Sequence, residues 1–99
     1  MTGRDARPFV AHHIRQRANE LAEHNGAALH ELARWVENLP ARDPRMARIE
    51  MTDALDYDEG GFSGGPESEA LLDTYVAGDA AARDRWLEDY AAAVARFWS

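Results

Sequence analysis

The chain has 99 residues, enough for one domain with a single core, and it contains no cysteine, which excludes disulfides, thiolate metal ligands and a cysteine nucleophile. The net charge of −7 is uneven: residues 1–48 hold eight arginines against six carboxylates, whereas residues 49–99 hold three against twelve. Such an acidic second half argues against binding to nucleic acid or to an anionic membrane surface. Because no apolar run approaches the ~20 residues of a membrane span, we expect a soluble, cytoplasmic protein.

The first predicted element is one long helix over residues 8–39, with Pro8 in its first turn. One face of this helix, called the seam below, is formed by residues at alternating steps of four and three positions over more than three heptads. These residues are Ile14, Ala18, Leu21, Asn25, Ala28, Leu32, Trp35 and Leu39. The pair Asn25-Gly26 is also typical of a helix end. A bend or break at Gly26 is therefore nearly as compatible with the pattern as a continuous helix.

Three further helices are predicted after Pro40. Asp43 is a natural N-cap for a helix over residues 44–56, and Pro66 fits the first turn of a helix that reaches Gly78. Asp79 then caps a last helix that reaches about Phe97.

These elements predict an all-α fold: a compact bundle of four to five helices, mostly with antiparallel neighbours, because the connections are short. We expect one domain over residues 1–99. Its irregular parts are a flexible N-terminus over residues 1–7 and an acidic, glycine-rich loop over residues 57–65.

The four histidines, His12, His13, His24 and His30, all fall on the first predicted helix. Glu20 and His24 lie one turn apart, but their spacing fits an ordinary surface pair, and no His-Glu-x-x-His or Glu-x-x-His motif is present. We interpret the histidines as part of a solvated polar face. Because nucleotide-binding loops and nucleophile elbows are also missing from the sequence, we predict that the protein is not an enzyme.

The stretch 56–67 reads DYDEGGFSGGPE and resembles an EF-hand calcium loop. In that family, carboxylates occupy the first and third positions, a glycine the sixth, a backbone carbonyl the seventh and a bidentate glutamate the twelfth. The resemblance implies the calcium ligands Asp56, Asp58, Phe62 through its carbonyl, and Glu67.

Other residues of this stretch favour a solvated connector. Gly60 supplies no side-chain oxygen at the fifth position, Ser63 replaces the usual aliphatic residue at the eighth, and Pro66 directly precedes Glu67. The chain also has no second loop, although EF-hands ordinarily work in pairs. We favour the connector, keep calcium as the alternative, and expect no other cofactor.

Phe97 and Trp98 are adjacent near the C-terminus, and neighbouring residues of a helix point about 100° apart. Packing of both rings on the bundle is the simpler interpretation. If one ring is exposed instead, we expect it to bind another protein, because aromatic side chains are enriched at protein interfaces. Our functional prediction is a non-catalytic helical interaction domain that binds a partner protein or a second copy of itself, with a calcium-binding domain as the alternative.

Overall fold

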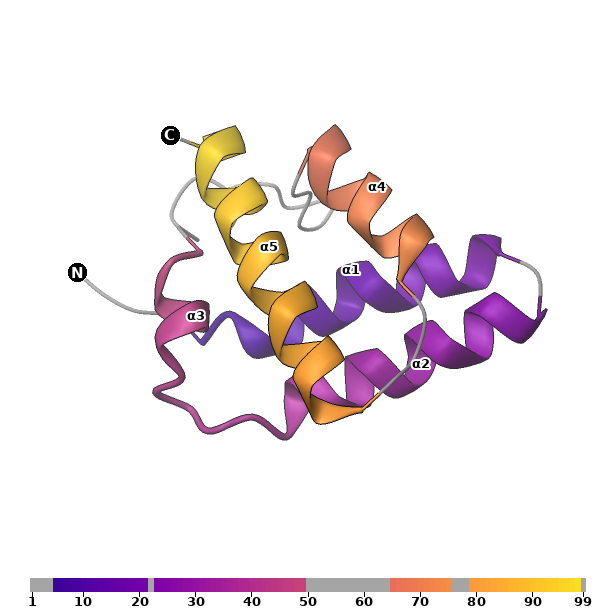
Figure 1. Cartoon of the computed structure of the whole chain (residues 1–99), viewed down its shortest axis with the longest axis horizontal. Coiled ribbons are helices and arrows are strands. Elements are labelled where there is room, and N and C mark those ends of the chain that lie inside the picture. The colour runs from indigo at the N-terminus through magenta and orange to yellow at the C-terminus, as the bar shows by residue number, and fades with distance from the viewer. Residues whose placement is uncertain (1–4, 22, 50–64, 76–78, 99) are drawn as a thin grey trace.

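The computed structural model describes residues 5–21, 23–49, 65–75 and 79–98, and for residues 23, 24 and 98 it describes the backbone alone. The described part contains helices and no strand, which confirms the predicted all-α bundle of four to five helices (Figure 1). The helices are α1 (Arg7–Glu20), α2 (Glu23–Glu37), α3 (Pro44–Ala47), α4 (Pro66–Thr74) and α5 (Ala80–Trp98).

Helices α1 and α2 form an antiparallel hairpin rather than one helix over residues 8–39, so that prediction is wrong (Figure 1). The chain leaves the helical conformation at Leu21, whose backbone is extended and whose amide donates to the Ala18 carbonyl. Folding back buries two apolar stripes against each other, which a straight helix would leave in water. The buried stripes comprise Val10, Ala11, Ile14 and Ala18 in α1, and Leu29, Leu32, Ala33 and Val36 in α2.

The alternative prediction of a break at Gly26 is also wrong, because Gly26 lies within the first turns of α2. A Cβ atom at this position would lie 2.8 Å from the Ala18 carbonyl oxygen of α1. The absence of a side chain lets the two helix backbones approach each other closely near the turn of the hairpin.

Helix α3 begins where the sequence predicts and ends early. The Asp43 carboxylate accepts a hydrogen bond from the Arg45 amide at 2.9 Å, as an N-cap does. The helix ends at Ala47, after a single turn, rather than near Asp56. The predicted continuation over residues 50–56 lies outside the described residues.

Helices α4 and α5 complete the bundle and lie beside each other over one side of the hairpin (Figure 1). Pro66 begins α4 as predicted, but α4 ends at Thr74, and the predicted end at Gly78 falls outside the described residues. Asp79 caps α5 by accepting from the Ala82 amide at 3.0 Å. Helix α5 buries Trp86, Leu87, Tyr90, Ala91, Ala93 and Val94.

Of the irregular segments predicted over residues 1–7 and 57–65, residues 1–4 and 57–64 are outside the described part. Arg7 already begins α1. Within the described ranges, no helix combines the length and the apolar composition that crossing a bilayer requires.

Candidate functional site

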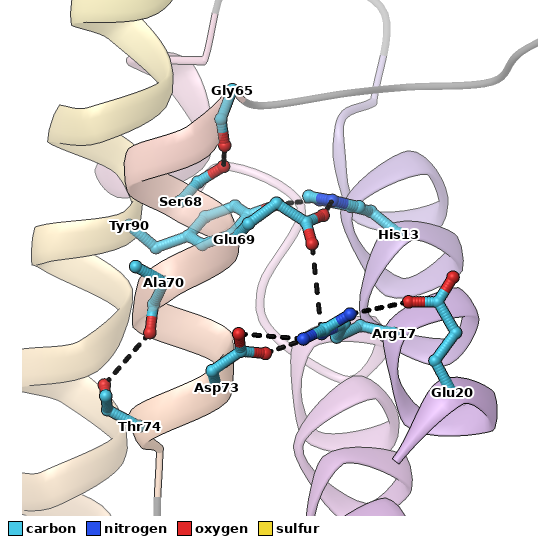
Figure 2. A network of polar contacts seen from close by, with 10 residues as sticks. All are labelled: His13, Arg17, Glu20, Gly65, Ser68, Glu69, Ala70, Asp73, Thr74 and Tyr90. Carbon is cyan, nitrogen blue, oxygen red and sulfur yellow. Dashed lines mark hydrogen bonds and ion pairs between the residues drawn. The ribbon is translucent and has the colours of Figure 1, made fainter.

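A buried histidine joins three helices at the centre of the bundle (Figure 2). His13 of α1 is only 4% exposed. Its Nδ1 atom lies 2.5 Å from the hydroxyl of Tyr90 on α5, and its Nε2 atom lies 2.6 Å from Oε2 of Glu69 on α4. Both ring nitrogens are therefore hydrogen-bonded, which is what burial of a polar ring requires.

Tyr90 lies at the inner end of this chain of hydrogen bonds. Its side chain is fully buried and stacks on Trp86 with ring centroids 4.8 Å apart. Burial raises the pKa of Tyr90 well above its ordinary value near 10, and the negative charge of Glu69 raises it further. The phenol therefore keeps its proton and can donate a hydrogen bond to Nδ1 of His13, in which case the Nε2–H group of His13 donates to Glu69.

Arg17 lies one turn after His13 and makes a second bridge from α1 to α4. Its guanidinium donates to both oxygens of Asp73, at 2.5 and 2.8 Å, and to Glu20 at 2.7 Å. Oε1 of Glu69 lies 3.9 Å from the Arg17 Nε atom. These carboxylates raise the pKa of Arg17, first through the hydrogen bonds that Arg17 donates to Asp73, so its charge is permanent.

A polar hollow of about 400 Å³ opens beside this network. Its lining consists of His13, Gln16, Arg17, Asn19, Glu20 and Glu69. The carboxylates in and beside it already bind Arg17 or His13, so the network ties α4 to the hairpin (Figure 2). Nowhere in the described part of the chain do three or more His, Asp or Glu side chains gather as a metal ion would require.

The predicted calcium ligand Glu67 lies in the first turn of α4, where it pairs with Arg96 of α5. Its Oε1 atom accepts from the Arg96 Nε atom at 3.3 Å, and its Oε2 atom makes a shorter contact with Nη2. The other predicted ligands, Asp56, Asp58 and Phe62, lie outside the described residues.

Of the two predicted interface residues, Phe97 is placed in full. It lies near the end of α5, and its side chain is 49% exposed. One part of the ring covers Gly65, because a Cβ atom on that glycine would lie 2.6 Å from the Phe97 Cγ atom. Trp98 is the last residue of α5, and its side chain is outside the description.

The prediction that the histidines form a solvated face is wrong for His13 and right for His12, which is exposed. A sequence signal for His13 exists. The residue lies three positions after Val10 and directly before Ile14, within an apolar face of the helix. Its partners Glu69 and Tyr90 are 56 and 77 positions away, and no local pattern points to them.

The geometry leaves the family of the protein undefined, and so do the comparisons with known proteins. Neither a family model, nor a curated protein, nor a solved structure matches this chain.

Proposed function

We propose that this protein is a small, non-catalytic, cytoplasmic interaction domain that binds a partner protein or a second copy of itself. The observation that carries the proposal is the exposed ring of Phe97. Among the described residues, Phe97 is the one large hydrophobic side chain that is substantially exposed, at 49%. Exposed aromatic rings are enriched at the centres of protein interfaces, where a few side chains supply most of the binding energy.

Charge defines the kind of surface that would bind there. Residues 49–99 hold twelve carboxylates against three arginines. The ring of Phe97 follows Arg96, whose guanidinium is occupied by Glu67. A partner with an apolar pocket inside a basic rim would complement this surface, because opposite potentials speed encounter and suppress wrong partners.

The His13 network supports a non-catalytic role. Glu69, His13 and Tyr90 bind one another, and each comes from a different helix. This arrangement joins elements of the fold, which is a sufficient reason for these groups to be buried together.

The test compares Phe97→Ala with the matched control Arg85→Ala, an exposed residue on the same helix. Sedimentation equilibrium measures self-association, and affinity capture from the host cell measures partner binding. We expect Phe97→Ala to weaken the association by about tenfold or more while Arg85→Ala leaves it unchanged. A protein that stays monomeric and captures no partner would refute the proposal, and so would equal binding by both variants.

The calcium-binding alternative makes a specific demand on Glu67. To ligate an ion within residues 56–67, this carboxylate has to leave Arg96. Arg96→Gln removes the competing cation and should raise calcium affinity, whereas Glu67→Gln should abolish binding. If calorimetry detects no heat at millimolar calcium for the native chain or for Arg96→Gln, this alternative is eliminated.

A further inference from the structure

Polar contacts join helix α4 to α1. The helix has nine residues, of which Ser68 and Leu72 are buried. Its polar contacts to α1 are the pair of Glu69 with His13 and the pair of Asp73 with Arg17, with a longer contact of 3.9 Å between Glu69 and Arg17 (Figure 2). The two pairs differ in one respect, since imidazole gains and loses a proton near neutral pH and guanidinium does not.

With His13 neutral, all hydrogen bonds of the chain run in one direction. The Tyr90 hydroxyl donates to Nδ1, and Nε2 donates to Glu69. Each group then has the partner that its chemistry requires.

A proton added at Nδ1 changes the two ends of the ring in opposite ways. Nδ1 becomes a donor, so the Tyr90 oxygen has to accept and its own proton has to turn away into buried surroundings. At the other end, the hydrogen bond to Glu69 becomes an ion pair, and charge-assisted hydrogen bonds are roughly twice as strong as neutral ones.

The charges around the ring tolerate this proton. Helix α4 presents Glu69 and Asp73, α1 presents Glu20 and Arg17, and α5 presents the uncharged Tyr90. Among the described residues of this network, three carboxylates therefore accompany one guanidinium. The Glu69 side chain is 41% exposed and borders the polar hollow, which gives protons from water a route to the ring.

We propose that His13 is a proton-dependent latch: on protonation it holds Glu69 of α4 more tightly and gives up the hydrogen bond donated by Tyr90 of α5. Acidification thereby strengthens the attachment of α4 to α1. This property is independent of the interaction function proposed above, since it concerns how the bundle itself is held together.

The test is a double-mutant cycle between His13→Gln and Glu69→Gln, measured by urea unfolding at pH 5.5 and pH 8.0. These values lie on either side of the range in which imidazoles ordinarily titrate and above that of carboxylic acids. We expect the coupling between the two residues, expressed as a ratio of unfolding constants, to be about threefold larger at pH 5.5, because a protonated imidazole binds a carboxylate through a stronger, charge-assisted hydrogen bond. Equal coupling at both pH values, or weaker coupling in acid, would overturn the latch.

A control pair lies elsewhere in the bundle, between α1 and α2. Glu37→Gln removes the partner of Arg15, and because both groups keep their charges at pH 5.5 and pH 8.0, the cost of this substitution should not change with pH. If His13→Gln fails to fold, the single variant Glu69→Gln still decides the matter. Its destabilisation has to be greater at pH 5.5 than at pH 8.0 by a factor that Glu37→Gln does not show, and a factor common to both variants would refute the proposal.

Tyr90→Phe tests the other end of the ring. Without the hydroxyl, protonation of His13 no longer costs a donated hydrogen bond, so the gain in stability on acidification should be larger than in the native chain. An unchanged gain would show that Tyr90 takes no part in the latch, and a smaller gain would contradict the cost assigned to its hydrogen bond.

Discussion

Gly65 holds a backbone conformation that side chains of L-residues rarely adopt. Its φ of 92° and ψ of 173° fall in a region that is essentially restricted to glycine. It directly precedes α4, and the ring of Phe97 fills the space where a Cβ atom would lie. Two independent obstacles therefore oppose any larger residue at this position.

We expect Gly65→Ala to lower the free energy of unfolding by about 1–3 kcal/mol, because the backbone strain adds to the clash with Phe97. Urea denaturation monitored by circular dichroism measures the loss. The double variant with Phe97→Ala separates the two causes, since it removes the ring and keeps the strain. If the double variant is as stable as Phe97→Ala alone, strain contributes nothing and the prediction is wrong in that part.

At the scale of single residues, local chemistry was predictable and distant partners were not. The caps Asp43 and Asp79 were found in sequence because a cap binds amides two or three positions away. His13 was misplaced because its burial depends on Tyr90 and Glu69, which only the packing of α4 and α5 brings to it. The candidate site therefore could not be predicted, even though His13 lies in an apolar helix face that the sequence pattern indicates.

At the scale of elements, helix content was predictable but the position of the turn in the first hairpin was not. The heptad spacing continues through Leu21 and Asn25, yet a continuing period is equally compatible with a helix that folds back. In the structure Asn25 is exposed, and the buried face of α2 passes through Leu29 and Leu32, of which only Leu32 belongs to the predicted seam. The seam predicted for one long helix corresponds in the structure to two apolar stripes, one on α1 and one on α2, that face each other.

Gly26 provides a test of that hairpin. In an exposed helix position, replacing glycine by alanine ordinarily stabilises a protein by up to about 1 kcal/mol. Here the added Cβ atom would lie 2.8 Å from the Ala18 carbonyl oxygen, so we expect Gly26→Ala to destabilise by about 1–3 kcal/mol. The measurement is thermal or urea unfolding.

The matched control is Asn25→Ala, an exposed position of the same helix. Alanine has the higher helix propensity, so this variant should be neutral or slightly more stable. A stabilising Gly26→Ala would contradict the close approach of α1 and α2 and would instead favour the long helix.

At the scale of the whole molecule, arginine side chains pair with carboxylates that lie 22 to 40 positions away in the sequence. Arg15 pairs with Glu37 between α1 and α2, Arg45 and Arg48 reach Asp84 and Glu88 on α5, and Arg96 reaches Glu67 on α4. The composition, eleven arginines and no lysine, gave no indication of this pairing. Most of these pairs are exposed, and each exposed pair contributes between about 0 and 1 kcal/mol.

The pairs have a joint consequence in acid. Hydrogen bonds from arginine lower the pKa of three carboxyl groups: Arg7 acts on Asp5, Arg15 on Glu37 and Arg45 on Asp43, with burial partly opposing each shift. A carboxyl group whose pKa is lower in the folded state contributes stability that is fully present above its unfolded value. That contribution is lost as the pH falls below the ordinary values of 3.8 for aspartate and 4.5 for glutamate.

Of these three carboxyl groups, Asp43 is the clearest to test, because its side chain is only 7% exposed and binds Arg45 through both oxygens. We expect the part of the unfolding free energy that these arginine–carboxylate pairs supply to be level above about pH 5 and to fall steadily below pH 4. Asp43→Asn should reduce the slope of that fall against pH by up to about one bound proton. Arg45→Gln should flatten the curve similarly, because it removes the cause of the lowered pKa, and combining the two changes should add little further. Urea unfolding between pH 2 and pH 7 provides the curves. An acid slope that survives both substitutions at full size would mean that Arg45 does not lower the pKa of Asp43 in the folded chain, and that acid acts on the bundle elsewhere.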